Sequence, residues 1–376
     1  MKKIGIITFH ASLNCGSMLQ TYALQEVLRR KYNADVEIIN YSNKGQRQYY
    51  AFLDMKLRPR VQKANLKAIP YWGEMKSVRN DYQSFAKDNF VLSGDLLKKY
   101  SQLEGIDEKY DIVIAGGDQV WNIKCRDADD AYFLSFVKNA KKVSYSPSMG
   151  AMNVMKYAAE PEKYANYIKD FNYLSIREPN GQKWVKELTG LDIPIVADPT
   201  MLLTVDEWTN YLQIEEVKEK FIFYYAFSYE KDSNNQIIQQ ISEKTGLPVY
   251  VIDAKSWGVN RLDRFGIKLY HKSGPLAFLE LMKNAQLVIT QSFHGTVFAS
   301  LFHRNFWSIR NRVVVNKEDD RATSIMNQVG LLDRYQVIDD LVNIDLFQEI
   351  DYESVDRNIE RLRKDAYSYI DKFMND

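Results

Sequence analysis

Short apolar segments alternate with amphipathic segments over most of the first half of the chain. Period-2 or continuous apolar runs of this length predict strands, and apolar positions that recur every three to four residues predict helices. The strands are expected at 4–9, 36–41, 142–148, 173–178 and 194–203, and at the start of 111–122. The helices are expected at 17–31, 161–171 and 182–188. This alternation predicts a parallel sheet that is covered by helices on both faces.

The second half repeats the same rhythm. Strands are expected at 221–227, 247–252, 285–290 and 305–309, and helices at 234–244, 275–284, 295–302, 321–329 and 352–375. A chain of 376 residues exceeds the usual size of one core, so two domains are expected, 1–203 and 204–376. The last helix is a candidate to pack back on the first domain. We therefore predict two Rossmann-like α/β domains that face each other across a cleft, with the ligand in that cleft.

The stretch 43–103 interrupts the alternation, because its pattern is mostly helical. Within it, the segment 46–70 carries a basic cluster formed by Lys56, Arg58, Arg60, Lys63 and Lys67. One interpretation is a solvated helix face. The other is a contact with the phosphates of a lipid-linked substrate or with an anionic membrane surface, that is, peripheral membrane association.

The composition argues against nucleic-acid binding, a disulfide framework, a cysteine metal site and a membrane span. Lys and Arg total 50 against 49 for Asp and Glu, so the net charge of +1 gives no sign of a nucleic-acid partner. The two cysteines form neither a disulfide framework nor a metal-ligand spacing, and no apolar run reaches the length of a membrane span. The N-terminus lacks the apolar core of a signal peptide. We expect a cytoplasmic protein that requires no metal and no cofactor.

Four histidines occur in the chain, and His294 has the most informative position. It follows an apolar strand in the segment TQSFHGTVFAS and opens a helix, where open α/β sheets place ligand groups. An imidazole there can bind a phosphate or act as a general acid, or it can simply cap the helix. His10 ends the first strand and is a second candidate for the cleft. His271 and His303 are expected to be structural or exposed.

Two further strand ends carry polar loops. The segment FHASLNCGSMLQ contains Asn14, which can cap a helix or bind a hydroxyl, and Gly16, which allows close backbone approach. It matches neither G-x-G-x-x-G nor a P-loop, which argues against a nicotinamide enzyme. The segment AGGDQVWN places Gly117, Asp118 and Gln119 at another strand end, where Asp118 can accept a sugar hydroxyl or cap a turn.

Arg177 ends the segment YLSIRE, where it can grip a phosphate or carboxylate, or pair with Glu178. Taken together, the segments GIITFHASLNCGSMLQTYALQ, DIVIAGGDQVWN, LSIREPNG, VADPTMLL and VITQSFHGTVFASLF resemble the polysaccharide pyruvyltransferase family. The resemblance spans most of the chain. It implies a fold similar to the glycosyltransferase-B architecture and transfer of a pyruvyl group from phosphoenolpyruvate to a sugar, as a cyclic ketal on two hydroxyls.

The resemblance also implies roles for the residues. His294 would be the general acid, and the acceptor would be a sugar of a polysaccharide or a lipid-linked oligosaccharide at the inner face of the membrane. Donor-binding residues would be Arg177, Ser292, Gly295 and Thr296, and acceptor-binding residues would be Asn14, Gly16, Gly117, Asp118 and Gln119. Some family members carry an arginine where this chain has Ser292. Arg304 and Arg310 are candidates to replace that cation.

Two other functions fit the sequence. The first is a glycosyltransferase that uses a nucleotide-sugar donor on the same architecture. The second is a non-catalytic glycan-binding protein, for which His294 would be dispensable. One architecture hosts many functions, so the fold alone does not choose among the three.

Overall fold

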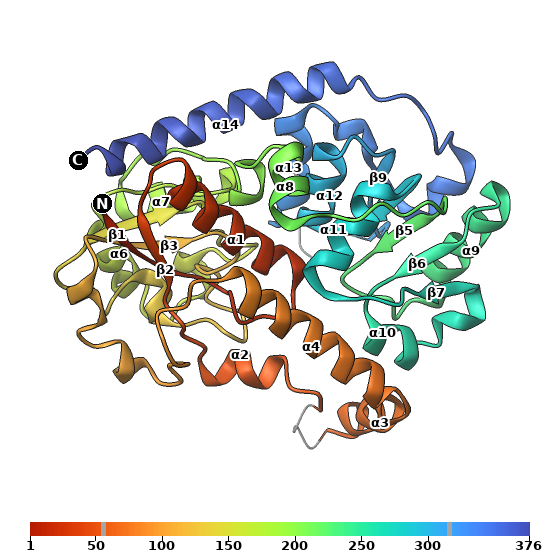
Figure 1. Ribbon diagram of the computed structural model, residues 1–376, viewed down its shortest axis with the longest axis horizontal. Helices are drawn as coiled ribbons and strands as arrows, with labels where there is room; N and C mark the ends of the chain where they lie inside the picture. The colour runs from red at the N-terminus through yellow and green to blue at the C-terminus, as the bar shows by residue number, and fades with distance from the viewer. Residues whose placement is uncertain (54–57, 314–317) are drawn as a thin grey trace.

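The chain folds into two parallel α/β domains that lie side by side (Figure 1). The structure is a computed structural model, and it describes residues 1–53, 58–313 and 318–376. Lys56 of the basic cluster lies outside the described residues. No described helix is long and apolar enough to cross a membrane.

The first domain is built on a four-stranded parallel sheet in the order β2-β1-β3-β4. Ile6 pairs with Ile38 on one side and with Ile114 on the other, so the central strands form a buried apolar core. The elements of this domain are β1 Lys3–Ile7, α1 Cys15–Arg30, β2 Asp35–Ile38, α2 Lys44–Tyr49, α3 Pro59–Ala68, α4 Trp72–Asn89, β3 Ile112–Gly116, β4 Lys141–Tyr145, α5 Val154–Tyr157, α6 Pro161–Lys169 and α7 Pro179–Thr189. Helix α8, Val205–Leu212, begins just after the predicted boundary and contacts helices of both domains.

The expected strands at 173–178 and 194–203 are wrong as continuous strands. The backbone there forms only two isolated bridges, Val143 with Tyr173 and Ile176 with Ile195. Pro194 has no N–H to donate, and Pro179 starts α7 immediately after this stretch. The apolar residues are buried as expected, but the backbone cannot extend the ladder.

The second domain contains a six-stranded parallel sheet in the order β10-β9-β8-β5-β6-β7. The two edge strands, β7 and β10, are three residues long and are not expected from the sequence, because a segment that short shows no measurable periodicity. The elements are β5 Ile222–Tyr225, α9 Asp232–Thr245, β6 Val249–Val251, α10 Ala254–Val259, β7 Ile267–Leu269, α11 Gly274–Asn284, β8 Leu287–Thr290, α12 Phe293–Leu301, β9 Phe306–Arg310, α13 Arg321–Val329, β10 Tyr335–Val337 and α14 Tyr352–Met374.

A shared apolar core joins the two domains. Trp208 of α8 is fully buried, and its ring lies 5.8 Å from that of Tyr22 in α1 and 5.2 Å from that of Phe298 in α12. Its indole N–H donates to the carbonyl of Thr200 at 3.1 Å, so the buried polar atom is satisfied. Since large buried aromatic side chains contribute strongly to packing, Trp208 helps to fix α1 against α12.

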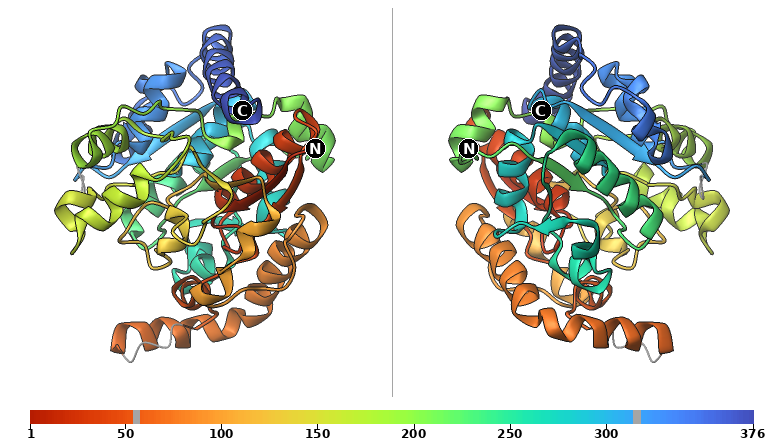
Figure 2. Two further views of the ribbon diagram at one scale, coloured as in Figure 1. Left: turned by 90° about the vertical axis from the view of Figure 1, so that its left-hand side faces the viewer. Right: turned by 90° about the vertical axis from the view of Figure 1, so that its right-hand side faces the viewer.

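The segment that interrupts the alternation also bridges the domains. Helices α3 and α4 extend from the first domain to the second, where α4 lies beside α11 and α3 lies beside α10 (Figures 1 and 2). Asp81 of α4 accepts hydrogen bonds from the backbone N–H and the hydroxyl of Ser273, at the start of α11. Tyr71 packs edge-on against Trp257 of α10, with ring centroids 5.9 Å apart.

Helix α14 runs along both domains and ends near the N-terminus of the chain (Figure 1). The guanidinium of Arg363 donates to the carbonyl of Met201 at 3.0 Å, and the hydroxyl of Tyr369 donates to the carbonyl of Ser144 at 2.8 Å. Phe373, near the end of the helix, is fully buried. The last helix of the second domain therefore packs on the first domain.

Replacing Phe373 by alanine removes a fully buried ring from this contact and should lower the free energy of unfolding by about 3–5 kcal/mol. Chemical denaturation followed by circular dichroism measures the change. The control is Asp365→Ala, on the exposed face of the same helix, which should change stability by less than about 0.5 kcal/mol. Equal effects of the two substitutions would contradict a role for α14 in holding the domains.

Candidate active site

The helix that carries His294 begins where a strand of the second domain ends. Strand β8 is fully buried, and α12 starts three residues after it with Ser292 as the N-cap, whose hydroxyl accepts from the backbone N–H of Gly295 at 3.3 Å. Opposite it, α1 of the first domain starts with Asn14 as the N-cap, whose side chain accepts from the N–H of Ser17 at 3.2 Å. The N-termini of two helices from different domains thus meet.

Gly16 and His294 form the closest contact between these helix ends. A Cβ atom on Gly16 would lie 2.0 Å from Nδ1 of His294, a distance that no side chain can occupy. Gly16 is therefore required because the imidazole ring lies directly against the backbone of α1. The ring is almost completely buried, with 6% of His294 exposed.

A buried ionic cluster lies on the other side of the imidazole. Nε2 of His294 is 3.6 Å from Oδ2 of Asp198, and the same carboxylate oxygen accepts from Nη1 of Arg177 at 2.9 Å. Nε of Arg177 donates to Glu178 at 2.8 Å, and the guanidinium lies 4.1 Å from the ring centroid of Phe293. Charged hydrogen bonds of this kind fix side chains in one geometry, because every partner is excluded from water.

The environment shifts the acidities of these groups. Burial alone would raise the pKa of Asp198, but the nearby His294 and Arg177 outweigh it and hold that pKa far below its ordinary range. Burial raises the pKa of Glu178, and Arg177 offsets only part of this effect. The two carboxyl groups on one guanidinium therefore differ: Asp198 stays ionised, whereas Glu178 binds a proton more readily than an exposed glutamate.

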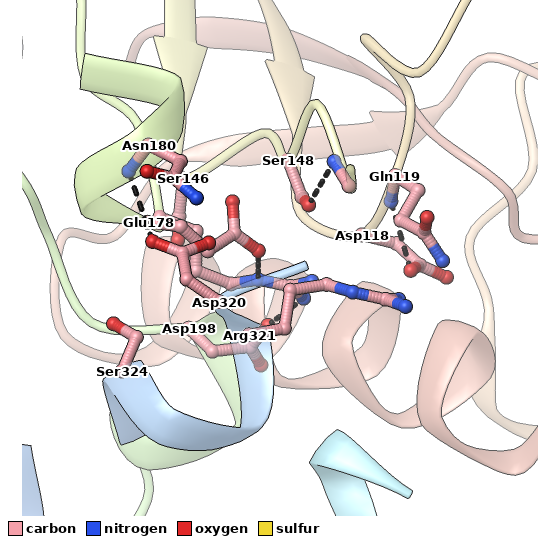
Figure 3. Close-up of polar contacts among 12 residues, drawn as sticks. Asp118, Gln119, Ser146, Ser148, Glu178, Asn180, Asp198, Asp320, Arg321 and Ser324 are labelled. Atoms are coloured by element: carbon pink, nitrogen blue, oxygen red, sulfur yellow. Dashed lines mark hydrogen bonds and ion pairs between the residues drawn. The ribbon is translucent and has the colours of Figure 1, made fainter. Parts of the chain in front are cut away.

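A second charged pair comes from the start of α13. Arg321 donates to both carboxylate oxygens of Asp319, at 2.8 and 2.6 Å, and Asp320 accepts from the backbone N–H of Asn180 in α7 at 2.9 Å. Figure 3 shows Glu178, Asp198, Asp320 and Arg321 together at the junction of the domains. Burial alone would lower the pKa of Arg321, but Asp319 outweighs it, so the guanidinium remains charged.

Several buried polar atoms at this junction have no hydrogen-bond partner among the described residues. They are Nε2 of His294, Oε2 of Glu178 and Oδ1 of Asp320. A buried polar atom without a partner costs about 1–3 kcal/mol, so such atoms are rare unless a ligand or water satisfies them. Oε2 of Glu178 and Oδ1 of Asp320 are therefore available to a bound polar group or water, whereas Nε2 of His294 already faces Asp198 at 3.6 Å.

The polar loop after β3 lies against the start of α1. Gly117 has φ +60°, and a Cβ there would lie 1.7 Å from the side-chain oxygen of Gln20, so glycine is required on both grounds. The hydroxyl of Ser17 donates to Asp118, whose backbone also has positive φ. Gln119 turns the other way, and its side-chain oxygen accepts from Asn122 at 2.9 Å.

Two cavities adjoin this junction. The first has a volume of about 350 Å³ and lies between the domains, with mainly aromatic walls that include Tyr49, Tyr225 and Phe227, and with Asn14 at its edge. The second, of about 420 Å³, lies in the second domain and is lined by residues that include Phe293, Arg310, Arg321 and again Phe227. The described walls of neither cavity include the His294 side chain, which is enclosed by the ionic cluster and Gly16.

These observations can be compared with known proteins. The family model for polysaccharide pyruvyl transferase matches residues 14–312, which contain both helix ends, the ionic cluster and most of the second cavity's walls. The chain belongs to the polysaccharide pyruvyl transferase family. It is therefore a transferase, and the resemblance expected from the sequence is confirmed. No curated protein sequence matches the chain.

Solved structures with the same fold include enzymes of nucleotide-sugar chemistry. The complex of Staphylococcus aureus MnaA with UDP is 12% identical in sequence and superposes with a TM-score of 0.51. The match covers 100% of this chain and 97% of the MnaA chain. The UDP-GlcNAc 2-epimerase of Methanocaldococcus jannaschii is 14% identical, covers 96% and 93%, and also has a TM-score of 0.51. These likenesses confirm the expected glycosyltransferase-B-like fold of two Rossmann-like domains.

The structure brings together most of the site residues expected from the sequence of this pyruvyl transferase family member. Asn14, Gly16, Asp118, Arg177 and His294 all lie at the junction of the domains. Asn14 acts as a helix cap, and the guanidinium of Arg177 is bound by two carboxylates rather than left open for a ligand.

The structure places Thr296, Arg310 and Arg304, three other residues considered for donor binding, in different environments. Thr296 points into the second domain, where its hydroxyl donates to Ser308 at 3.2 Å. Of the two arginines considered in place of a cation at position 292, Arg310 lines the second cavity. Arg304 does not approach the site, because it donates to the carbonyl of Phe302 at the far end of α12.

The other histidines lie outside the cluster. His10 is buried, and its ring contacts the side chain of Asn40 at 3.1 Å and the carbonyl of Thr8 at 3.3 Å. His303 pairs with Asp356 at 2.8 Å on the surface, and His271 lines a separate surface depression beside α11. The ring of His10 therefore contacts residues of the first domain and does not belong to the ionic cluster.

Sequence reasoning missed Asp198, Asp320 and Arg321. Asp198 follows an apolar segment and precedes a proline, which is a usable signal for a polar group at a strand end. Asp320 and Arg321 begin a helix and carry no such signal, because only the approach of the two domains places them near Arg177. Within the described ranges, no group of three His, Cys, Asp or Glu residues is arranged to hold a metal ion.

Replacing Gly16 by alanine should destabilise the protein by about 1–3 kcal/mol, because the new Cβ forces α1 away from the His294 ring. The matched control is Gly73→Ala. Gly73 lies in α4, and a Cβ added there would meet no atom within 4 Å, so this substitution should stabilise by about 0.5–1 kcal/mol. Thermal unfolding distinguishes the two, and effects of the same sign would contradict the contact.

The low pKa of Asp198 has a consequence for the pH dependence of stability. A carboxyl whose pKa is depressed in the folded protein stabilises it above the ordinary value of 3.8, and this stabilisation is lost as the pH falls below it. Asp198→Asn should therefore cost about 3–5 kcal/mol at neutral pH, since Arg177 loses a buried partner, and should flatten the loss of stability below pH 4.

Urea denaturation between neutral and acid pH measures this profile. Asp365→Asn, an exposed carboxylate on α14, is the control and should leave the profile unchanged. If the free energy of unfolding of the Asp198 variant falls with pH in parallel with that of the wild type, the buried carboxylate does not cause the loss of stability in acid.

Proposed function

We propose that the chain transfers a pyruvyl group from phosphoenolpyruvate to two hydroxyls of a sugar, which form a cyclic ketal. The observation that carries this proposal is the buried cluster of His294, Asp198, Arg177 and Glu178 at the junction of the domains, in a chain that belongs to the polysaccharide pyruvyl transferase family. Family membership supports the reaction class. The cluster supports a polar substrate at the junction of the domains.

The donor carries a phosphate and a carboxylate, so it needs cationic partners. Arg321 and Arg310 line one cavity, and the N-terminus of α12 faces the same region through Phe293. A helix N-terminus favours anions because its free N–H groups and its dipole point outward. Arg310 and the N-terminus of α12 support binding of the donor at the wall of the second cavity, where Arg321 is already paired with Asp319.

His294 is the proposed general acid. Protonation of the donor's methylene carbon leaves a cationic carbon at C2, which one sugar hydroxyl attacks. The C2–O bond to phosphate then breaks, and the second hydroxyl closes the ketal, with inorganic phosphate as the other product. Asp198 does not touch substrate in this scheme. It is a positioning residue, because its carboxylate lies 3.6 Å from Nε2 and orients the imidazole.

The acceptor is the less determined partner. A carboxyl with a raised pKa accepts a hydroxyl proton better than an ordinary one, and Glu178 has such a pKa together with an unpaired oxygen. The aromatic cavity between the domains fits a sugar, because rings such as Tyr49 and Phe227 stack on apolar sugar faces. We expect the sugar of a polysaccharide or lipid-linked oligosaccharide there, with no metal or further cofactor.

The test is release of inorganic phosphate from phosphoenolpyruvate in the presence of lipid-linked oligosaccharide extracts. His294→Asn should reduce acceptor-dependent release by about 10²–10⁴-fold, the usual contribution of a general acid. His303→Asn is the matched control, because His303 lies on the surface beside Asp356, and it should retain activity.

Three outcomes would contradict the proposal. Equal release by wild type and the His294 variant would remove the imidazole from the chemistry. If phosphoenolpyruvate is not consumed and UDP instead raises the Tm, the nucleotide-sugar glycosyltransferase becomes the better assignment. If a glycan binds with the same affinity to both proteins and neither donor reacts, a non-catalytic glycan-binding protein remains.

A further inference from the structure

Helix α3 and the turn that follows it form an exposed surface with two unusual properties. We name this the α3 face and define it by Lys63, Leu66, Lys67, Ile69 and Trp72. It lies at the outer edge of the molecule, beyond α4 and α10 (Figures 1 and 2). The residues combine exposed apolar side chains with positive charge.

The apolar part of the face is exposed to an unusual degree for side chains of this size. Leu66 is 67% exposed, Ile69 52% and Trp72 43%. They are spaced three residues apart, and the connecting segment Ile69–Tyr71 is a 3₁₀ helix, in which side chains at that spacing lie above one another. Leu66 lies near the end of α3, Ile69 opens the 3₁₀ helix and Trp72 opens α4, so the three exposed side chains follow one another within two turns of chain. The ring of Trp72 also contacts that of Phe52, with centroids 4.9 Å apart, so this residue is partly covered.

The opposite side of the same segment is anchored. Asn65 and Ala68 are buried, and Tyr71 packs against Trp257 and closely approaches Gly258 of α10. The side of the segment that packs on the protein is therefore formed by other residues, and the exposed apolar side chains are not needed for that packing.

The charge of the segment is equally one-sided. Residues 58–73 contain four basic residues and no acidic residue, a local charge of +4 in a chain whose net charge is +1. Lys63 and Lys67 are exposed, and no described carboxylate forms an ion pair with either of them. Uncompensated lysines beside exposed Leu, Ile and Trp are the composition of helices that lie in the interface of anionic lipid bilayers.

We propose that the α3 face docks on the surface of an anionic lipid bilayer. Trp72 would occupy the headgroup region, where its amphipathic ring is favoured, and Leu66 and Ile69 would enter the acyl boundary. Lys63 and Lys67 would lie among the lipid phosphates. Since α2 and α4 also supply walls of the aromatic cavity, docking brings that cavity to the lipid surface.

The experiment is vesicle flotation with the full chain, using phosphatidylcholine vesicles with and without about one-third phosphatidylglycerol. Wild type should float only with the anionic vesicles, and added salt should weaken binding. Lys63→Glu with Lys67→Glu should weaken partitioning at least tenfold. The matched control, Lys218→Glu with Lys220→Glu, changes the net charge equally at exposed lysines of the second domain and should stay within about twofold.

A second pair of variants tests the exposed apolar side chains without changing charge. Leu66→Ser with Ile69→Ser should also weaken partitioning about tenfold, whereas Leu332→Ser, at another exposed leucine, should not. The blue shift of tryptophan emission on anionic vesicles should be reduced in Trp72→Phe. This assay contains no donor or acceptor, so its result is independent of the transfer reaction.

Three results would overturn the proposal. The first is a wild-type chain that does not float with anionic vesicles at low salt. The second is equal weakening by the control charge reversal, which would indicate attraction without a defined face. The third is a dimer in lipid-free solution that Leu66→Ser with Ile69→Ser dissociates, without vesicle binding, which would assign the face to a second copy of the chain.

Discussion

The close approach of α1 to α12 is the constraint on which the site depends. At this point the His294 ring lies against the backbone of Gly16, and no side chain fits between them. The shared core around Trp208 holds the two helices at this distance. Because each domain supplies one helix end, neither could form the site alone. The geometry of this junction is therefore a property of domain packing and not of either Rossmann-like unit.

The same packing buries an arrangement of charges that would be unstable elsewhere. Arg177 is surrounded by Asp198 and Glu178, and Asp198 also faces His294, so each charge has an opposite neighbour. Burying such groups is costly, and a buried ion pair adds little stability compared with an apolar pair. What the cluster provides is fixed orientation, and it leaves Oε2 of Glu178 without a hydrogen-bond partner among the described residues. That combination is expected of a site that is organised before its ligand arrives.

Sequence patterns predict most of the fold, since strands and helices within each βα unit depend on local periodicity. The apolar pattern predicts burial of the two strands that do not form, but not their pairing. Pro194 lacks an N–H, and the hydroxyls of Ser144 and Ser175 take backbone hydrogen bonds that a ladder would use. For the site, strand ends locate His294, Arg177 and Asp118. Arg321 cannot be found this way, because its place beside the cluster follows only from how the domains meet, which no local pattern encodes.

The inserted helices limit how a substrate can reach the site. Asp81 of α4 is hydrogen-bonded to Ser273, and Tyr71 packs on Trp257, so the insertion of the first domain holds the second at two points. Helix α14 holds the opposite side through Tyr369. Wide opening of the domains would have to break all of these contacts and expose part of the shared core. The aromatic cavity already lies between the domains beside Asn14, so a ligand that occupies it need not break any of these contacts.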